Sequence, residues 1–343
     1  MPPLRIPERP LQWTRPLGDF IQGVSWSPSG TLLAVAESGG PIRVLDTQTG
    51  DTRQDWSGHE GGSFAAHFSP TDERVVSVGQ DGHVRFWEPA HREPRSAVPV
   101  PSKWVELASW SPDGRGLAIG AGREVLLLGA DGSVLHRLPP RKTTVTALAW
   151  RADSTRIAAA SYGAVQIWDA RSAEPDAPLE WKTSLISLAW SPDHRWLVAG
   201  TQEQAVQIWE LPFKPGEELA MSGYSVKVRE LCWHFGGRYL ATGDGQEIMV
   251  WDCQGKGPAG TSPRILSAHA HRITRLAYPR AGHLLASADE SGDLLLWNAG
   301  KGGDPLRRHR VGKAVGALAW SPDGRRLALG CEDGTVAVAL VEQ

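Results

Sequence analysis

The chain has 343 residues, of which 41% are hydrophobic and 22% charged, and its formal net charge is −2. These values are ordinary for a globular protein, and so small a net charge excludes a strong attraction of the whole molecule to nucleic acid or anionic membranes. No apolar run approaches the roughly 18 residues that span a bilayer, and the first residues, MPPLRIPERP, lack the apolar core of a signal peptide.

The chain contains three cysteines, Cys232, Cys253 and Cys331, and no two of them have CxxC spacing. An odd number of scattered cysteines predicts neither a disulfide framework nor a cysteine zinc site, and it favours a reducing cytoplasm as the location. Arginine far outnumbers lysine, and alanine and glycine are abundant. This bias is typical of a GC-rich genome and suggests a bacterial source.

An aromatic residue followed by a turn signal recurs eight times along the chain. We call these residues the anchors and number the units they belong to from one to eight. The anchors are Trp26, Phe68, Trp110, Trp150, Trp190, Trp233, Tyr278 and Trp320. Their spacing is in the low forties, a period typical of β-propellers. We expect the anchors to wedge between neighbouring blades, because burial of a tryptophan is strongly stabilising.

Each anchor is followed by the same order of short strands, which unit five illustrates. Its first strand ends at Trp190, and Ser191-Pro192-Asp193 predicts a turn because proline fixes φ and aspartate bonds its own backbone. The following residues predict a second strand over 196–201 and a third over 205–210. No segment has sustained helical periodicity, so we expect an all-β fold.

A less regular fourth strand precedes the next unit in seven cases. We place these strands near residues 52–57, 94–100, 133–138, 177–182, 217–222, 263–268 and 305–309. Unit eight ends after three strands, so we expect a strand near residues 10–16 to complete it and to close the ring, which removes free sheet edges. The prediction is one domain, residues 1–343, folded as a closed β-propeller of eight four-stranded blades.

The units resemble WD40 repeats over essentially the whole chain. The dipeptide that ends the third strand in this family appears as Trp168-Asp169 and Trp251-Asp252, and the Gly-His that opens a repeat appears as Gly58-His59. Elsewhere the dipeptide is degenerate, as at Trp87-Glu88, so the chain resembles a divergent member. The resemblance implies a propeller, with seven blades as the alternative because that number is commonest in the family. It also implies a non-catalytic scaffold that binds peptides or proteins.

The resemblance further implies a buried structural network of His, Ser, Asp and Trp side chains. The matching positions of unit two hold His59, Ser77, Asp81 and Trp87. A buried imidazole and carboxylate must satisfy each other's hydrogen bonds. Unit seven has His269, Ser287 and Trp297, but Ser291 stands at the position expected for the aspartate. The other six units lack the set, and we expect apolar packing to replace it there.

Two alternatives to a structural role concern the same histidines. His59, Ser77 and Asp81 are the residue types of a hydrolytic triad, but a nucleophile needs an exposed hydroxyl and an oxyanion pocket, so we assign no catalytic residue. His269 and His271 share one face of an extended segment and would suit a metal ion, but no third ligand is near in sequence. We therefore predict no metal site and no cofactor.

The loops that lead into the first strands carry the strongest candidates for binding. In the WD40 family these loops line the mouth of the central channel. Here they hold aromatic and cationic residues, namely Phe20, Lys103, Trp104, Lys142, Lys227, His271, Arg272 and Lys313. The turns between second and third strands, placed farther out on the same face, are more acidic: Asp81, Glu124, Glu203, Asp244, Glu247, Glu290 and Glu332. We infer a basic inner ring and an acidic outer ring.

These observations favour a non-catalytic scaffold for protein–protein interaction, which binds an acidic peptide at the basic ring with Trp104 or Phe20 as the apolar contact. Three alternatives remain open. The charges can simply keep the loops hydrated, the channel mouth can hold an enzymatic or metal-dependent site, or the basic ring can bind nucleic acid. The net charge disfavours the last, so we expect no nucleic-acid or membrane partner, and a monomer outside its complex.

Overall fold

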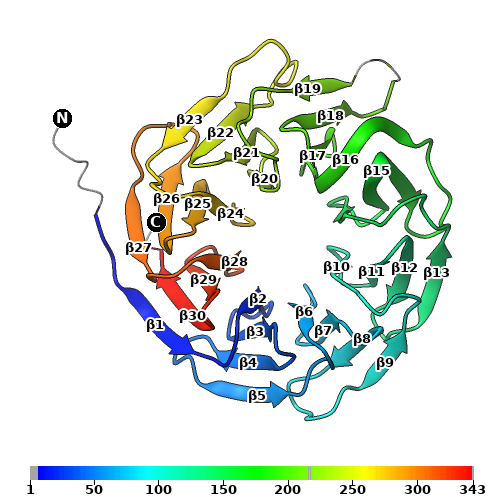
Figure 1. Cartoon of the computed structure of the whole chain (residues 1–343), viewed down its shortest axis with the longest axis vertical. Coiled ribbons are helices and arrows are strands. Elements are labelled where there is room, and N and C mark those ends of the chain that lie inside the picture. Colours follow the sequence, from blue (N-terminus) through cyan, green and yellow to red (C-terminus); the bar gives the residue numbers. More distant parts are fainter. Residues whose placement is uncertain (1–6, 215, 217, 342–343) are drawn as a thin grey trace.

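The computed structural model describes residues 7–214, 216 and 218–341. These residues form β-strands, turns and loops without any helix, so no helix that would cross a membrane is present among them. The strands form twisted sheets that stand side by side around a central axis, and the ring is evident in the view down that axis (Figure 1). The all-β propeller predicted from the period is confirmed.

Six sheets have four strands each. Three of them are β2 (Ile21–Trp26), β3 (Leu32–Glu37), β4 (Ile42–Asp46) and β5 (Thr52–Trp56); β6 (Ser63–Phe68), β7 (Val75–Gly79), β8 (His83–Trp87) and β9 (Ser96–Pro99); and β10 (Leu107–Trp110), β11 (Gly116–Ala121), β12 (Glu124–Gly129) and β13 (Val134–Leu138). The others are β20 (Leu231–Trp233), β21 (Tyr239–Asp244), β22 (Glu247–Asp252) and β23 (Arg264–Ser267); β24 (Ile273–Ala277), β25 (Leu284–Asp289), β26 (Asp293–Asn298) and β27 (Arg307–Arg310); and β28 (Val315–Trp320), β29 (Arg326–Cys331) and β30 (Thr335–Leu340) with β1 (Leu11–Pro16).

The remaining sheet has six strands and contains units four and five. Its strands are β14 (Ala147–Trp150), β15 (Arg156–Asp169), β16 (Leu179–Trp190), β17 (Trp196–Thr201), β18 (Val206–Glu210) and β19 (Leu219–Met221). Strand β16 pairs with β15 near its start, where Leu179 faces Val165, and with β17 near its end, where Trp190 faces Leu197. Strand β16 therefore serves as the fourth strand of unit four and the first strand of unit five. Strand β15 likewise spans the second and third strands of unit four, since residues 157–160 pair with β14 and residues 162–165 pair with β16.

The prediction of eight four-stranded blades is wrong, because the described residues form seven hydrogen-bonded sheets. Seven is the alternative number that the family resemblance implied. The physical reason lies in the sequence of β16, LEWKTSLISLAW, which contains no Gly, Pro, Asn or Asp to turn the chain. The expected loop between units four and five is absent, and the two units share one continuous sheet. The other fourth strands lie where the sequence placed them.

The ring closes through the N-terminal strand, as predicted. Strand β1 pairs antiparallel with β30, from Leu11 opposite Ala339 to Pro16 opposite Thr335. Trp13 in β1 is 8% exposed, and its indole N–H donates to the carbonyl oxygen of Thr47 in unit one at 2.9 Å. The first and last strands of the described residues are thus held in one sheet, which leaves no open array edge at this point.

The anchors join each unit to the one before it. Five tryptophan anchors donate their indole N–H to the backbone carbonyl of the residue that precedes the previous anchor. The pairs are Trp26 to Ala319 (2.9 Å), Trp110 to His67 (3.2 Å), Trp150 to Ser109 (2.8 Å), Trp190 to Ala149 (3.1 Å) and Trp320 to Ala277 (3.0 Å). The first pair connects unit one to unit eight across the closure. The wedge role of the anchors is confirmed, and it includes a hydrogen bond as well as apolar contact.

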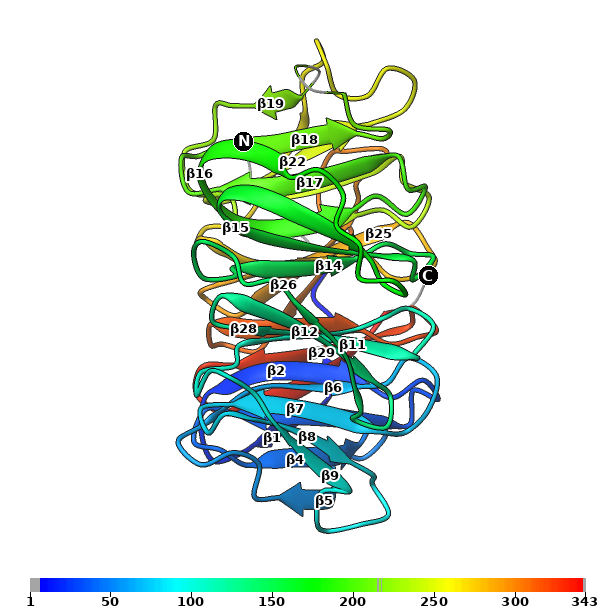
Figure 2. The same ribbon diagram turned by 90° about the vertical axis from the view of Figure 1, so that its right-hand side faces the viewer.

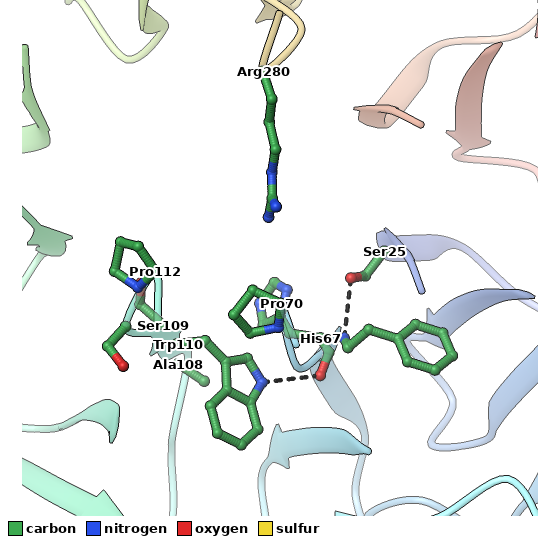
Figure 3. Close-up of a pocket in the computed structure, with 10 residues that line it drawn as sticks. Ser25, His67, Pro70, Ala108, Ser109, Trp110, Pro112 and Arg280 are labelled. Atoms are coloured by element: carbon green, nitrogen blue, oxygen red, sulfur yellow. Dashed lines mark hydrogen bonds between the residues drawn. The ribbon is translucent and has the colours of Figure 1, made fainter. Parts of the chain in front are cut away.

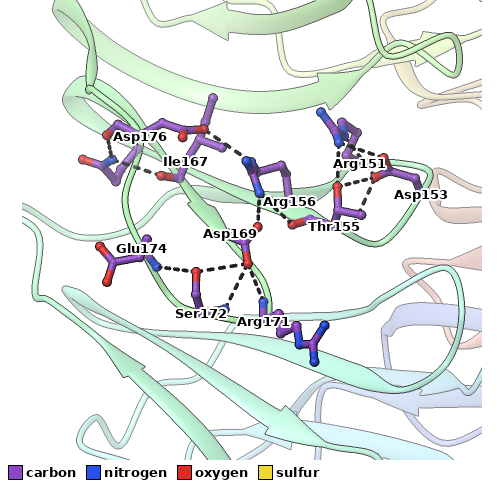
Figure 4. A network of polar contacts seen from close by, with 11 residues as sticks. Arg151, Asp153, Thr155, Arg156, Ile167, Asp169, Arg171, Ser172, Glu174 and Asp176 are labelled. Carbon is purple, nitrogen blue, oxygen red and sulfur yellow. Dashed lines mark hydrogen bonds and ion pairs between the residues drawn. The ribbon is translucent and has the colours of Figure 1, made fainter.

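The acidic residue that ends a third strand pairs with an arginine that begins the second strand or stands just before it. In unit four, Arg156 forms ion pairs with Asp169 and Asp176, and the second oxygen of Asp169 accepts the backbone N–H groups of Arg171 and Ser172 (Figure 4). These turn hydrogen bonds outweigh desolvation and lower the pKa of Asp169 to about 2. The pairs Arg195–Glu210 and Arg238–Asp252 repeat the arrangement. The Trp-Asp dipeptide therefore has a structural role at the rim.

Candidate functional site

The loops of each unit alternate between the two faces of the ring, because neighbouring strands are antiparallel. The loops before the first strands and the turns between second and third strands lie on one face, which we call the entry face. The turns after the first and third strands lie on the opposite face, the exit face. In the side view the strands run from one face to the other (Figure 2).

A pocket of about 480 Å³ opens on the entry face, at the inner rim of units six, seven, eight and one. We call it the entry pocket. Its aromatic and charged lining residues are Phe20, Lys227, Arg229, Glu230, Arg272, Arg275 and Glu332. Three of the eight residues that the sequence singled out, Phe20, Lys227 and Arg272, line it together. Phe20 belongs to unit one and meets units six and seven only because the ring closes.

A buried carboxylate holds the loop that carries Phe20. Glu37 at the end of β3 is 1% exposed, and its Oε2 accepts the backbone N–H groups of Gly18 (2.8 Å) and Asp19 (3.1 Å). Arg43 forms an ion pair with the other oxygen of Glu37. The ring of Phe20 lies over Gly316, where an added Cβ would come within 3.3 Å of it. The position of Phe20 is thus fixed by its own loop and by the glycine opposite.

A second carboxylate, at the same point of unit six, holds the loop that carries Lys227. Asp244 ends β21, and its Oδ1 accepts hydrogen bonds from the backbone N–H of Ser225 (2.7 Å), the hydroxyl of Ser225 (2.7 Å) and the backbone N–H of Val226 (3.2 Å). Because Asp244 is only 7% exposed, these hydrogen bonds are worth more than exposed ones. Lys227 therefore projects from an ordered loop.

Unit seven uses a third such carboxylate, and here the sequence-based expectation is wrong. Asp289 at the end of β25, rather than Ser291, bonds His269: the Nδ1 to Oδ2 distance is 2.8 Å, and His269 Nε2 lies 2.7 Å from the hydroxyl of Ser287. Trp297 donates to that hydroxyl at 2.8 Å. Asp289 comes two residues after Ser287, so its side chain lies on the same side of β25, and Ser291 instead donates to Asp289. Unit seven thus has a complete network.

The network of unit two consists of the four residues named from the sequence. Trp87 donates to Ser77 Oγ (2.8 Å), Ser77 lies 2.8 Å from His59 Nε2, and His59 Nδ1 lies 2.8 Å from Asp81 Oδ1. The order is self-consistent when the imidazole is neutral, and burial lowers the pKa of His59. Desolvation of Asp81 is outweighed by its hydrogen bonds from His59 and Arg85, which lower the pKa of its carboxyl.

Unit six has a variant of the network that the sequence did not suggest. Trp251 donates to the hydroxyl of Tyr224 (3.0 Å), which lies 2.8 Å from the hydroxyl of Thr242. Tyrosine thus replaces histidine, and burial raises the pKa of Tyr224 to about 12. The expectation that apolar packing replaces the network in the six units other than two and seven is therefore wrong for unit six.

The charges at the entry pocket are only partly free. Arg272 donates to Glu290 Oε1 through Nε (2.9 Å) and Nη2 (2.5 Å), and Arg275 lies 3.4 Å from Glu230 Oε1. Burial raises the pKa of Glu230, although Arg275 opposes this. Lys227 and Arg229 are exposed and form no ion pair among the described residues, although the charge of Arg229 also opposes the rise in the pKa of Glu230. These two side chains are the cations available to a ligand.

The other five predicted residues lie outside this pocket. Lys103, Lys142, His271 and Lys313 are exposed in their loops. Trp104 is 57% exposed, and its ring centroid lies 5.6 Å from that of Phe64. The basic inner ring is therefore not one continuous site. The outer ring is also less acidic than predicted, because Asp81 and Asp244 turn inward and Glu290 is paired with Arg272.

Sequence reasoning missed Arg229, Glu230 and Arg275. Glu230 and Arg275 stand three residues before their anchors, Trp233 and Tyr278, in neighbouring units. Alternate residues of a strand share a face, so residues one and three places before an anchor face the same way. That register was a signal available in the sequence, because the other six units have Gly, Ala, Leu or Ser at the third place.

The buried networks leave no exposed nucleophile or metal ligand set at these histidines. Ser77 is 0% and His59 2% exposed, and the Ser77 hydroxyl is engaged by both Trp87 and His59. Both ring nitrogens of His269 are hydrogen-bonded, so this residue has no free atom for a metal shared with His271. Among the described residues no cluster of three His, Cys, Asp or Glu side chains suits a metal ion.

Comparisons with known proteins assign the family. The model of the WD domain, G-beta repeat, matches residues 132–169, 179–210, 217–252, 260–298 and 304–338, and the model of the anaphase-promoting complex subunit 4 WD40 domain matches residues 13–111. The chain belongs to the WD40-repeat family. The five segments matched by the WD-domain model correspond to units four to eight. The segment matched by the second model contains units one and two. Both matches agree with the repeat seen in the sequence.

The curated relatives are distant and much longer. The telomerase protein component 1 of Rattus norvegicus is 22% identical over 87% of this chain, which spans 12% of that protein. Protein HIR1 of Phaeosphaeria nodorum is 21% identical over 81% of this chain, which spans 33% of it. The chain therefore matches only a part of each. Among solved structures, the crystal structure of the computationally designed Ika8 protein has a TM-score of 0.82 at 21% sequence identity. The match covers 98% of this chain and 100% of the Ika8 chain. That likeness concerns the fold alone.

Proposed function

We propose that this WD40 propeller is a non-catalytic scaffold that holds a partner protein by an acidic segment seated in the entry pocket. The observation that carries the proposal is the position of Lys227 and Arg229, two exposed cations that form no ion pair among the described residues, beside the half-buried ring of Phe20. An acidic side chain would pair with the cations, and an apolar neighbour would cover the ring. WD40 propellers generally act as protein-interaction scaffolds.

The order of the loops supports this proposal. The loops that carry Phe20 and Lys227 are tied to Glu37 and Asp244, and the loop before Arg272 is tied to Asp289 through His269. A site whose loops are already ordered loses less conformational entropy when a ligand binds. These three carboxylates also support a non-catalytic role, because their oxygens accept hydrogen bonds that hold the loops in place.

We also propose that the protein is cytoplasmic and monomeric outside its complex. All three cysteines are unpaired, as a reducing compartment requires. Cell fractionation and analytical ultracentrifugation would test the two statements separately.

The decisive experiment measures peptide binding by fluorescence polarisation at low salt. The probes are labelled peptides with Asp and Glu on both sides of a Leu or Phe, together with charge-reversed versions. We expect K227E/R229E to weaken binding of the acidic peptides at least tenfold, about 1.4 kcal/mol, and added salt to weaken binding to the native protein because it screens the ion pairs.

The matched control is R115E/K301E, which makes the same charge change at two exposed positions in turns of the exit face. It should bind as the native protein does, and the thermal midpoints of both variants should be unchanged. W104A tests whether the exposed tryptophan of unit three extends the site. Equal binding by K227E/R229E and the native protein would refute the proposed site, whereas capture of acidic peptides lost only in W104A would move it to units two and three.

A further inference from the structure

A second cavity, of about 520 Å³, lies on the exit face at the ring axis. We call it the exit cavity. Residues of units one, two and three line one side of it, and Arg280, from the turn after the first strand of unit seven, lies opposite and extends toward them (Figure 3). Residues from units so far apart along the chain meet here only because the first strands converge on the axis.

Polar groups without partners gather in this cavity. Within the described part of the chain, the guanidinium group of Arg280 has neither an ion pair nor a hydrogen bond, and neither ring nitrogen of His67 has a hydrogen-bond partner. The hydroxyl of Ser109 also lines the cavity and has no hydrogen-bond partner among the described residues. The hydroxyl of Ser25 accepts a hydrogen bond from the backbone N–H of Phe68 at 3.1 Å, and its own hydrogen remains free to donate. Arg280 is exposed and the other three side chains are partly exposed, so all four are accessible to a ligand.

The charge state of these groups favours an anion. Arg280 is a permanent cation whose planar fork suits carboxylate and phosphate oxygens. Burial lowers the pKa of His67, so at neutral pH its imidazole offers one donor and one acceptor. The cavity lining contains no acidic residue. A ligand that carries one negative charge would thus find a cation and several donors with no opposing carboxylate.

The remaining lining is apolar and rigid. Phe68, Pro70, Trp110 and Pro112 contribute to the wall. Trp110 is fixed by its hydrogen bond to the carbonyl of His67 and by an edge contact with Phe86, whose ring centroid is 6.3 Å away. The prolines belong to the turns that follow the anchors and have restricted backbones. Such a wall suits a flat apolar group.

We propose that the exit cavity binds a small organic anion, with one carboxylate or phosphate group on Arg280 and a planar apolar body against Pro70 and Trp110. The volume is within the range of sites for small molecules, roughly 300–1,000 Å³. This site is separate from the entry pocket, which opens on the other face, and it does not depend on the scaffold function proposed above.

The test is isothermal titration of the purified full chain with matched probes. Phenylacetate and phenyl phosphate carry both features, phenylacetamide lacks the charge, and acetate and inorganic phosphate lack the apolar body. We expect saturable binding of at least one of the two aryl anions, at least tenfold stronger than the binding of the three partial probes, and the comparison of the two distinguishes a carboxylate from a phosphate source. Equal affinity for phenylacetamide, or saturation by none of the probes, would overturn the proposal.

Variants locate the site. R280Q removes the cation and should weaken aryl-anion binding at least tenfold, whereas R115Q, at a 90% exposed arginine in an exit-face turn of unit three, should leave it unchanged. Ala108→Phe fills the cavity with Arg280 intact and should abolish binding, and K227E/R229E on the entry face should not affect it. The thermal midpoint of each variant verifies folding. Native affinity in R280Q would refute the assignment even if binding occurs.

Discussion

At the scale of single residues, the same function is carried by different side chains at one point of the repeat. Glu37, Asp244 and Asp289 each end a second strand, and each accepts hydrogen bonds from the loop that precedes the first strand of its own unit. In unit two this position is Gly79, where a Cβ would come within 2.5 Å of His59 Cβ, and Asp81 supplies the carboxylate from the following turn. The loop needs a carboxylate acceptor at this point of each of these units. The space around the backbone determines whether the acceptor comes from the end of the second strand or from the turn that follows it.

The replacement of Asp289 by alanine tests the corrected network of unit seven. We expect D289A to lower the free energy of unfolding by about 2–4 kcal/mol, because His269 and the backbone N–H groups of Ser291 and Asp293 lose a buried acceptor. S291A removes only one donor to the same carboxylate and should cost less than about 1 kcal/mol. Urea denaturation at neutral pH measures both, and equal losses would contradict the assignment.

The pH dependence of this loss is set by the pKa of Asp289. Its hydrogen bonds from His269 and Ser291 outweigh desolvation and lower the pKa to about 2, below the value of about 3.9 in an unfolded chain. A lowered carboxyl pKa contributes stability above the unfolded value, and that contribution is lost as the pH falls through the folded one. The difference between native protein and D289A should therefore be complete above about pH 5 and shrink toward pH 2.

At the scale of elements, the anchor is the residue that packs each unit against the unit before it. Trp150 fills the space between units three and four and donates to Ser109 at 2.8 Å, whereas Trp104, the same residue type in an entry-face loop, is 57% exposed. The sequence distinguishes them only by the turn signal that follows an anchor. Position in the repeat, rather than residue type, therefore decides which tryptophans hold the ring together.

The pair W150A and W104A measures this difference. We expect W150A to lower the free energy of unfolding by about 3–5 kcal/mol, because it leaves a cavity and an unpaired carbonyl between two units. W104A should change it by less than about 1 kcal/mol. Chemical denaturation followed by circular dichroism provides both values, and a W150A variant as stable as the native protein would show that the anchors do not determine the packing.

Much of the element order could be predicted because the same pattern of strands and turns recurs in every unit. The anchors, the fourth strands and the closure by residues near 10–16 follow from the period. The continuity of β16 was missed, although its lack of turn-forming residues indicated it, because the period imposed a loop there. The entry pocket was predicted in part, by Phe20, Lys227 and Arg272. A cation remains free only when no acidic side chain pairs with it. Arg272 is paired with Glu290, 18 residues away in the sequence, and the sequence alone does not give the distance between two such side chains.

At the scale of the whole molecule, closure of the ring and formation of the entry pocket are one event. Phe20 follows β1 directly and lies over Gly316 of unit eight, and Val315 and Gly316 line the same pocket as Lys227. The backbone N–H of Leu17 donates to the carbonyl of Gly334 at 2.8 Å, next to the β1–β30 ladder. A ring that opens between units one and eight would therefore separate Phe20 from the cations.

Deletion of residues 1–16 tests this coupling. The shortened chain loses the whole β1–β30 ladder and the buried indole of Trp13, so we expect the thermal midpoint to fall by at least about 5 °C and the binding of acidic peptides to weaken in parallel. A synthetic peptide of residues 7–16 added in trans should restore both, since it can re-form the missing edge strand. T14A, at an exposed position of β1, serves as the matched control and should change neither. A shortened chain with native stability and native peptide binding would show that units one and eight hold together without their shared sheet.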